Sequence, residues 1–193
     1  MRFYECGGDG IYVANAGPEP CRNVTVRNTL LSRGLRQGMS VIDVEGLLLE
    51  NCVFERTLGE NPQAGIDFEP NFPSQRMKGI VMRGCRFSEN VRKGINLHLD
   101  SLKGASEPVD FLIENCVSVS NAIGFGLCFN SKDQSFVKGR VIVSNCLFSA
   151  SGEQGIDITQ KPRSGLQLEF HDVVVEKSCL KDQSQGEIHL QDK

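Results

Sequence analysis

The sequence predicts an all-β solenoid, a fold in which short strands stack coil upon coil. A glycine followed by an alternating apolar strand recurs along the chain, and a second alternating strand recurs between its copies. No segment between them keeps the apolar period of a helix. We expect about six to seven coils in a single domain, residues 1–193, with a segment of a longer solenoid as the alternative.

The first repeated strand starts at a glycine. Its copies read GIYV, GMSV, GIDF, GINL, GLCF and GIDI, and they begin at Gly10, Gly38, Gly65, Gly94, Gly126 and Gly155. A weaker copy, EIHL, begins at Glu187. Units of this length cannot bury their apolar faces alone, so their recurrence indicates stacking of neighbouring coils.

The second repeated strand ends in a column of asparagines. Its copies include LLLENCVF, FLIENCVS and VIVSNCLF, and the column consists of Asn28, Asn51, Gly84, Asn115 and Asn145. We expect this column at a bend, where the amide side chain bonds to the backbone and to the next asparagine.

Five of the eight cysteines fall in the column that follows. Its members are Thr29, Cys52, Cys85, Cys116, Cys146 and, with a small slip, Cys179. Stacked side chains have parallel Cβ vectors, a poor geometry for disulfides, so we expect buried free thiols. The lack of any CxxC pair argues against zinc. Cys6, Cys21 and Cys128 lie off the column and receive no predicted role.

The alternation of the glycine-led strand predicts three outward columns. The first is Tyr12, Ser40, Asp67, Asn96, Cys128, Asp157 and His189. The second is Ala14, Ile42, Glu69, His98, Asn130, Thr159 and Gln191. The third is Ala16, Val44, Asn71, Asp100, Lys132 and Lys161. From the third to the sixth coil these columns form a polar wall.

The two-strand repeat, the asparagine column and the stretches GIDFEPN and QGIDI resemble the right-handed parallel β-helix of the pectate-lyase-like superfamily, from about Gly8 to about Leu190. Such proteins are mostly polysaccharide lyases, hydrolases, epimerases, phage depolymerases or uncharacterised bacterial repeat proteins. The resemblance implies a secreted or cell-envelope location, although no signal peptide stands in the chain. EQGIDI matches only the tail of the polygalacturonase motif NTDGxDI, so that family's catalytic residues are not carried over.

The polar wall is predicted to bind or cleave a polysaccharide in a groove between loops. The flanking loops are Arg56–Gln63, Asn71–Met77, Ser101–Asp110 and Ser131–Lys138. The catalytic candidates are Glu69, His98, Asp67 and Lys132. The substrate-binding candidates are Asn96, Asp100, Asn130, Asp157 and Lys161.

Several chemistries remain open at this wall. Asp67 and Glu69, about 7 Å apart on one strand, would suit a hydrolase, whose carboxylates stand roughly 5 to 9.5 Å apart. His98 or Lys132 would serve as the base of a lyase or epimerase. Alternatively, Asp67, Glu69 and Asp100 would hold a calcium ion, the one cofactor considered.

A different class of function is a non-catalytic β-helix, such as an adhesin-like protein or a carbohydrate-binding stalk segment. The open ends of a solenoid expose strand edges, which predicts end-to-end or homo-oligomeric contact. The net charge of −3 points to neither nucleic acid nor membrane as a partner.

Overall fold

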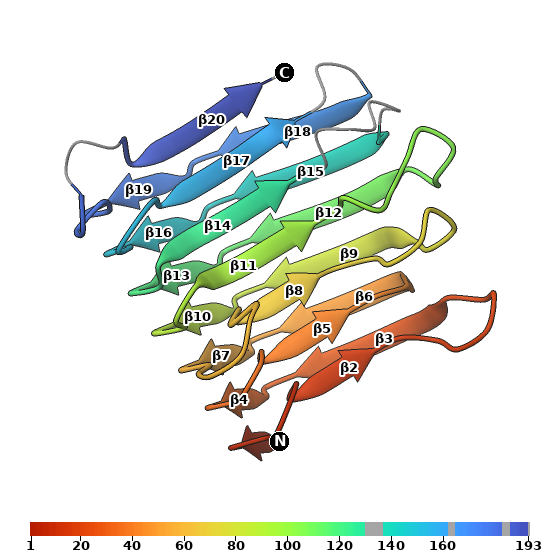
Figure 1. Cartoon of the computed structure of the whole chain (residues 1–193), viewed down its shortest axis with the longest axis horizontal. Helices are drawn as coiled ribbons and strands as arrows, with labels where there is room; N and C mark the ends of the chain where they lie inside the picture. The colour runs from red at the N-terminus through yellow and green to blue at the C-terminus, as the bar shows by residue number, and fades with distance from the viewer. Residues whose placement is uncertain (130–136, 162–164, 183–185, 193) are drawn as a thin grey trace.

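A computed structural model describes residues 1–129, 137–161, 165–182 and 186–192. The chain is an all-β parallel β-solenoid of about six turns, and no helix occurs among the described residues. Three parallel sheets run the length of the molecule, and the coils stack from the N-terminus at one end to the C-terminus at the other (Figure 1). The predicted fold class is confirmed.

Each coil contributes one strand to each sheet, which we call sheets A, B and C. Sheet A contains β1 (Arg2–Tyr4), β4 (Leu30–Ser32), β7 (Val53–Glu55), β10 (Arg86–Ser88), β13 (Val117–Val119), β16 (Leu147–Ser149) and β19 (Val174–Glu176). Sheet B contains β2 (Ile11–Val13), β5 (Met39–Val41), β8 (Ile66–Phe68), β11 (Lys93–His98), β14 (Ile123–Cys128), β17 (Ile156–Lys161) and β20 (Ile188–Asp192). Sheet C contains β3 (Cys21–Arg27), β6 (Val44–Glu50), β9 (Met77–Arg83), β12 (Val109–Glu114), β15 (Gly139–Ser144) and β18 (Leu166–His171).

The core lies between the three sheets and is filled by side chains of like kind stacked in register. Phe54 pairs with Phe87 in sheet A, and their rings stack with centroids 4.9 Å apart. Phe68 of sheet B meets Phe111 of sheet C edge-on at 5.1 Å. Their complete burial supplies the main driving force for stacking, because apolar area is removed from water at every coil.

The glycine column of sheet B has a steric cause. A Cβ atom at Gly38 would lie 2.5 Å from the carbonyl oxygen of Gly65, and a Cβ atom at Gly124 would lie 2.5 Å from that of Gly155. The backbones of successive coils therefore approach too closely for any side chain, which explains why glycine recurs here.

The fifth copy of this strand begins two residues earlier than the sequence pattern predicts. Gly124 occupies the glycine column, and Gly126 pairs with Asn96 in the first outward column. Cys128 pairs with His98 in the second outward column. The predicted place of Cys128 in the first column is wrong, because two glycines two residues apart fit the same alternation.

The predicted asparagine column does lie at a bend, between sheets C and A. Its members adopt left-handed backbone angles: Asn28 has φ 49°, Asn51 53°, Asn115 54° and Asn145 50°. The side-chain ladder that we expected there forms instead inside the bend between sheets A and B. That ladder connects buried Thr57, Asn90 and Asn121.

The cysteine column is confirmed as a stack of free, buried thiols in four successive coils, at Cys52, Cys85, Cys116 and Cys146. Cys179 is also free and buried, but it follows β19 and is not the next member of the column. The next coil places Val173 there, since the N–H of Val174 donates to the carbonyl of Cys146.

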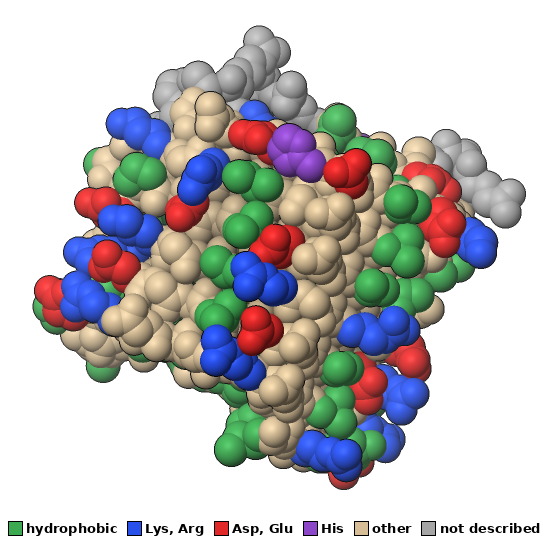
Figure 2. Space-filling view, turned by 180° about the vertical axis from the view of Figure 1, so that it is seen from behind, with side chains coloured by type: hydrophobic (Ala, Val, Ile, Leu, Met, Phe, Trp, Pro, Cys, Tyr) green, Lys and Arg blue, Asp and Glu red, His purple; other side chains and the backbone are tan. Residues whose placement is uncertain are grey.

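The outer face of sheet C carries oppositely charged residues that alternate along the solenoid. In one column Arg27, Glu50, Arg83 and Glu114 follow one another in register. A second column contains Arg22, Glu45 and Lys78, and Asp110 pairs with Arg140 in two later coils. Between them, partly exposed side chains form an apolar stripe, Leu48, Val81, Leu112 and Ile142. Figure 2 shows charges of both signs around hydrophobic side chains on this side.

The last described coil exposes Ile188 and Leu190 of β20. No helix with the length and hydrophobicity of a membrane span occurs in the described part of the chain.

Candidate functional site

The first outward column of sheet B is polar but largely hidden from solvent. Ser40, Asp67 and Asn96 pair in register across three coils, and their exposed fractions are 0%, 1% and 3%. Burial raises the pKa of Asp67 to about 7, and repulsion by Glu69 adds to this effect. Asp67 therefore lies in the predicted outward column but is almost completely buried, with Asn96 in contact with its carboxylate.

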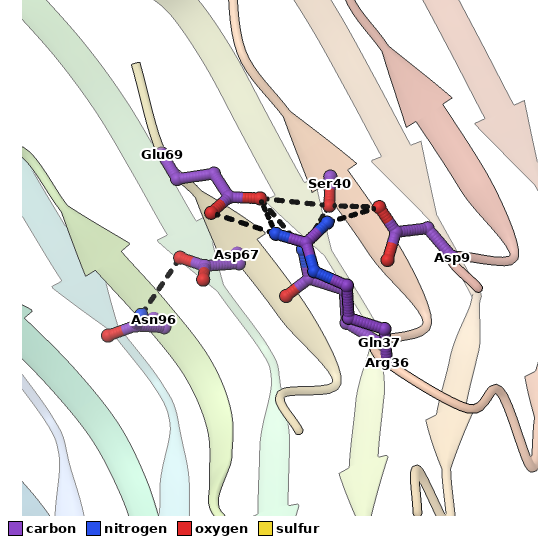
Figure 3. A network of polar contacts seen from close by, with 7 residues as sticks. All are labelled: Asp9, Arg36, Gln37, Ser40, Asp67, Glu69 and Asn96. Carbon is purple, nitrogen blue, oxygen red and sulfur yellow. Dashed lines mark hydrogen bonds and ion pairs between the residues drawn. The ribbon is translucent and has the colours of Figure 1, made fainter. Parts of the chain in front are cut away.

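A polar network holds Glu69 on the side of the earlier coils (Figure 3). Arg36 Nη2 lies 3.0 Å from Glu69 Oε1, and Arg36 Nη1 lies 2.9 Å from Asp9 Oδ2. Gln37 Nε2 donates to Glu69 Oε1 at 2.9 Å, and Ser40 Oγ donates to Asp9 Oδ2 at 2.7 Å. Arg36 thus bridges two carboxylates from different coils. Asp9 Oδ1 is buried and has no hydrogen-bond partner among the described residues.

Asp67 belongs to a separate set of contacts that continues toward the later coils. Asn96 Nδ2 donates to Asp67 Oδ1 at 2.8 Å, and Lys93 Nζ donates to Asn96 Oδ1 at 2.9 Å. Lys93 lies across Gly126, where a Cβ atom would come within 2.9 Å of its Cδ and Cε atoms. The glycine at 126 therefore leaves space for this lysine on the outer face.

A pocket of about 310 Å³ opens beside these residues. Its lining consists of Asn61, Pro62, Arg92, Lys93, Asn96 and His98. The first two belong to the loop between β7 and β8, and the others belong to β11 and its approach. The predicted loop Arg56–Gln63 thus borders the wall. No carboxylate stands among the described residues that line this pocket, so its charge is positive.

His98, Asp100 and Cys128 form a compact group at the ends of β11 and β14. His98 Nε2 lies 3.4 Å from Asp100 Oδ2. Hydrogen bonding to Asp100, and then to Cys128, raises the pKa of His98 to about 10, which keeps the imidazole protonated at neutral pH. Because its folded pKa is raised, this group stabilises the fold at low pH and loses that effect as pH rises through about 10.

At the next coil, Asp157 accepts contacts from two neighbours. His189 Nδ1 lies 2.7 Å from Asp157 Oδ1, and Thr159 Oγ1 donates to the same oxygen at 3.4 Å. Lys161 ends β17 and is half-buried. These residues continue the polar wall toward the C-terminal end.

The predicted site residues do not form one cluster. Glu69 and His98 occupy adjacent coils on the same face, but Glu69 contacts Arg36 whereas His98 contacts Asp100. Asn130 and Lys132 lie outside the described residues. Asp67, Glu69 and Asp100, the expected calcium ligands, each face different partners. Among the described residues, the group with metal-ligand spacing is His98, Asp100 and Cys128.

Sequence reasoning missed three of these groups. Arg36 precedes β5, and Lys93 is the first residue of β11, one position before the repeated motif GINL; at both positions the repeat does not define side-chain direction. Cys128 was assigned to the wrong column because of the two-residue shift in its coil. The two glycines in GFGLC were the available signal, since only one of them is required by coil stacking.

The comparisons with known proteins identify a relative but no activity. No family model matches the chain, and no solved structure matches it. The chain is similar to the SPbeta prophage-derived uncharacterized protein YorA of Bacillus subtilis (strain 168), with 32% identity over 171 residues. The match covers 81% of this chain and 26% of the relative. The chain thus spans about a quarter of the length of the curated relative that it matches.

Proposed function

We propose that this chain binds an acidic polysaccharide along the outer face of sheet B. The observation that carries the proposal is the pocket lined by Arg92, Lys93 and His98, with Asn96 beside them. Basic side chains recognise carboxylate or sulfate groups by charge-assisted hydrogen bonds, and the amide orients neutral hydroxyls. The parallel wall repeats at the inter-coil spacing of about 4.8 Å, which suits an elongated ligand.

The resemblance to pectate-lyase-like β-helices supports the same substrate class and an extracellular or cell-envelope site of action. We favour binding over hydrolysis, because Asp67 is 1% exposed and Glu69 is engaged by Arg36, Gln37 and Ser40. Two carboxylates in these positions offer a poor route for an acid–nucleophile pair to reach a glycosidic bond. A lyase or epimerase step remains the second proposal, since it requires cationic groups near a uronate.

The test compares two polymers that share one sugar backbone, one with free carboxylates and one with methyl-esterified carboxylates. Polygalacturonate should bind the immobilised protein, whereas its fully methyl-esterified counterpart should bind at least about tenfold more weakly, because the ester removes the anionic partner. Alginate and hyaluronate would define the preferred acidic polymer, and dextran would serve as a neutral reference. Raising the salt concentration should weaken binding of the acidic polymers, since exposed charges are screened.

Matched variants locate the binding surface. Lys93→Gln and Arg92→Gln should reduce binding on sheet B, whereas Arg140→Gln, a cation on sheet C, should leave it unchanged. Equal binding of charged and esterified polymers, or equal loss with Arg140→Gln, would contradict the proposal. Ultraviolet absorbance and reducing-sugar assays of the same mixtures would detect lyase or hydrolase products.

A further inference from the structure

We propose that His98, Asp100 and Cys128 form a binding site for a transition-metal ion of the Zn²⁺ type. The three side chains supply one nitrogen, one oxygen and one sulfur donor, and these donor atoms all lie within 4.8 Å of one another. The proposal goes beyond polysaccharide binding and does not depend on it. The shared element is His98, which also lines the cationic pocket.

The spacing of the donors fits a tetrahedral ion. Nitrogen and oxygen donors about 2.0 Å from zinc stand about 3.3 Å apart, and nitrogen and sulfur donors stand about 3.5 Å apart. His98 Nε2 and Asp100 Oδ2 are separated by 3.4 Å. A direct bond between an imidazolium and a carboxylate is shorter, about 2.7 to 2.9 Å. The contact between His98 and Asp100 is therefore a long one, and its length matches the distance between two ligands of one zinc ion.

The backbone fixes the three donors before any ion binds. His98 and Cys128 are partners in the β11–β14 ladder, and the N–H of Leu99 donates to the carbonyl of Cys128 at 3.2 Å. Leu99 points into the core with an exposed fraction of 0%. His98 and Asp100, on either side of Leu99, consequently turn to the outer face. Three ligands thus come from two hydrogen-bonded segments of adjacent coils.

A second observation points to a missing partner. Among the residues that the structure describes, Asp100 Oδ1 is buried and has no hydrogen-bond partner. A buried carboxylate oxygen without a partner is unfavourable, and a cation at this group would supply one. The carboxylate would use either or both oxygens as ligands.

The same three residue types occur in cysteine nucleophile systems, but the arrangement differs. In such a relay the imidazole stands between the thiol and the carboxylate, which places the sulfur and the carboxylate oxygen about 7 Å apart. Here those atoms also lie within 4.8 Å of each other. The donors converge on one point, as ligands do.

The donor set also selects the class of ion. Calcium and magnesium prefer oxygen ligands only, whereas a thiolate and an imidazole favour zinc and related ions. Three protein ligands leave a fourth position open, as in catalytic zinc sites. Because the ligands would be a neutral imidazole, a carboxylate and a thiolate, the bound ion would supply the positive charge at the edge of the pocket.

Cobalt(II) provides the direct test. The chelator-treated protein should bind one equivalent of Co²⁺ with a thiolate-to-cobalt charge-transfer band, and Zn²⁺ should displace the cobalt. Cys128→Ser should abolish the band. Calorimetry with Zn²⁺ should show affinity reduced more than about 100-fold in Cys128→Ser and Asp100→Asn, since even an outer-sphere partner contributes about 10- to 100-fold.

Matched controls separate this site from other thiols and histidines. Cys21→Ser removes a half-buried free cysteine on sheet C, and His171→Gln removes a histidine paired with Glu169 at 3.0 Å. Both should bind Co²⁺ as the wild type does. Asp100→Asn keeps the side-chain shape and tests the site if Cys128→Ser fails to fold.

Two results would overturn the metal site: no thiolate band with one equivalent of Co²⁺, or an intact band in Cys128→Ser. Lys93→Gln distinguishes the two proposals. It should weaken acidic polysaccharide binding and leave Co²⁺ binding unchanged.

Discussion

The outer faces of sheets B and C differ in how far their polar residues are buried and paired. On sheet C several charges pair with an opposite charge in an adjacent coil, such as Arg83 with Glu114 at 2.6 Å and Arg140 with Asp110 at 2.7 Å. These side chains are partly exposed, from 21% for Glu114 to 57% for Arg140, so their burial costs less than that of Asp67. On sheet B, Asp67 is buried, and one buried oxygen each of Asp9 and Asp100 lacks a hydrogen-bond partner within the described part of the chain.

The difference indicates which face needs an explanation beyond folding. Neighbouring residues account for the polar groups of sheet C. On sheet B the burial of polar groups is not fully compensated by hydrogen bonds or ion pairs. Uncompensated buried polar groups of this kind concentrate at functional sites. The pocket and the donor cluster both lie on sheet B.

The largest expected effect concerns Asp67. Its pKa is raised from the ordinary 3.8 to about 7, so the folded state retains a proton that the unfolded chain releases. This contribution to stability is fully present below pH 3.8 and is lost as pH rises through about 7. At about 1.4 kcal/mol per pH unit, the free energy of unfolding should fall by about 4 kcal/mol.

Asp67→Asn should remove that fall. Urea unfolding at about pH 4 and about pH 8 would measure it, with the variant more stable than the wild type only at the higher pH. Glu114→Gln on sheet C is the control and should leave the pH dependence of the wild type. Parallel pH curves for Asp67→Asn and the wild type would show that burial does not perturb this acid.

The register that brings Cys128 beside His98 can be tested by two neighbouring substitutions. Gly124→Ala would place a Cβ atom 2.5 Å from a backbone oxygen, and we expect a loss of about 3 kcal/mol in unfolding free energy. Gly126→Ala would meet only the flexible end of Lys93 and should cost less than about 1 kcal/mol. Chemical denaturation measures both losses of unfolding free energy. A larger loss for Gly126→Ala than for Gly124→Ala would instead place Gly126 in the glycine column, as expected from the sequence.

The next prediction compares the loss of stability on removing one arginine from each face. Arg36→Met leaves Asp9 and Glu69 without their shared cation, and Asp9 has a side-chain exposure of only 8%. We expect destabilisation by about 2 kcal/mol, whereas Arg140→Met on sheet C should cost about 0.5 kcal/mol. Equal losses in thermal and urea unfolding would mean that the two faces do not differ as described.

The smallest effect belongs to the charge columns. Glu50→Lys would place a cation between Arg27 and Arg83, which lie 3.0 and 4.0 Å from the native carboxylate. We expect a loss of about 1 kcal/mol that shrinks in high salt, because exposed charges are screened. Glu50→Gln should cost less than Glu50→Lys. A loss independent of salt would point to packing instead of charge.

The fold could be predicted because its determinants are local and repeated. The inward side chains of GIDF and GINL, the glycine column and the thiols from Cys52 to Cys146 all follow from alternation and coil stacking. The shift in the fifth coil could not be recognised in this way, since a move of two residues keeps every side chain on its predicted face.

The candidate site was predicted only as a face. Alternation placed Asp67, Asn96 and His98 on one side of sheet B, and the register confirms this. The alternation gave no information about the burial of Asp67. It also gave none about Arg36, whose side-chain direction is set by the turn before β5. Which side chains touch across coils depends on the strand register and on loop packing. The residue type at one position of a single sequence does not determine either of them.

The alternating columns of sheet C also restrict how such a solenoid can grow or shrink. The first and third coils present Arg27 and Arg83, and the second and fourth present Glu50 and Glu114. Removing one coil would join like charges across the seam, whereas removing two adjacent coils would preserve the order. The charge order therefore repeats every two coils. We expect duplications and deletions in this part of the chain to be tolerated when they add or remove an even number of coils.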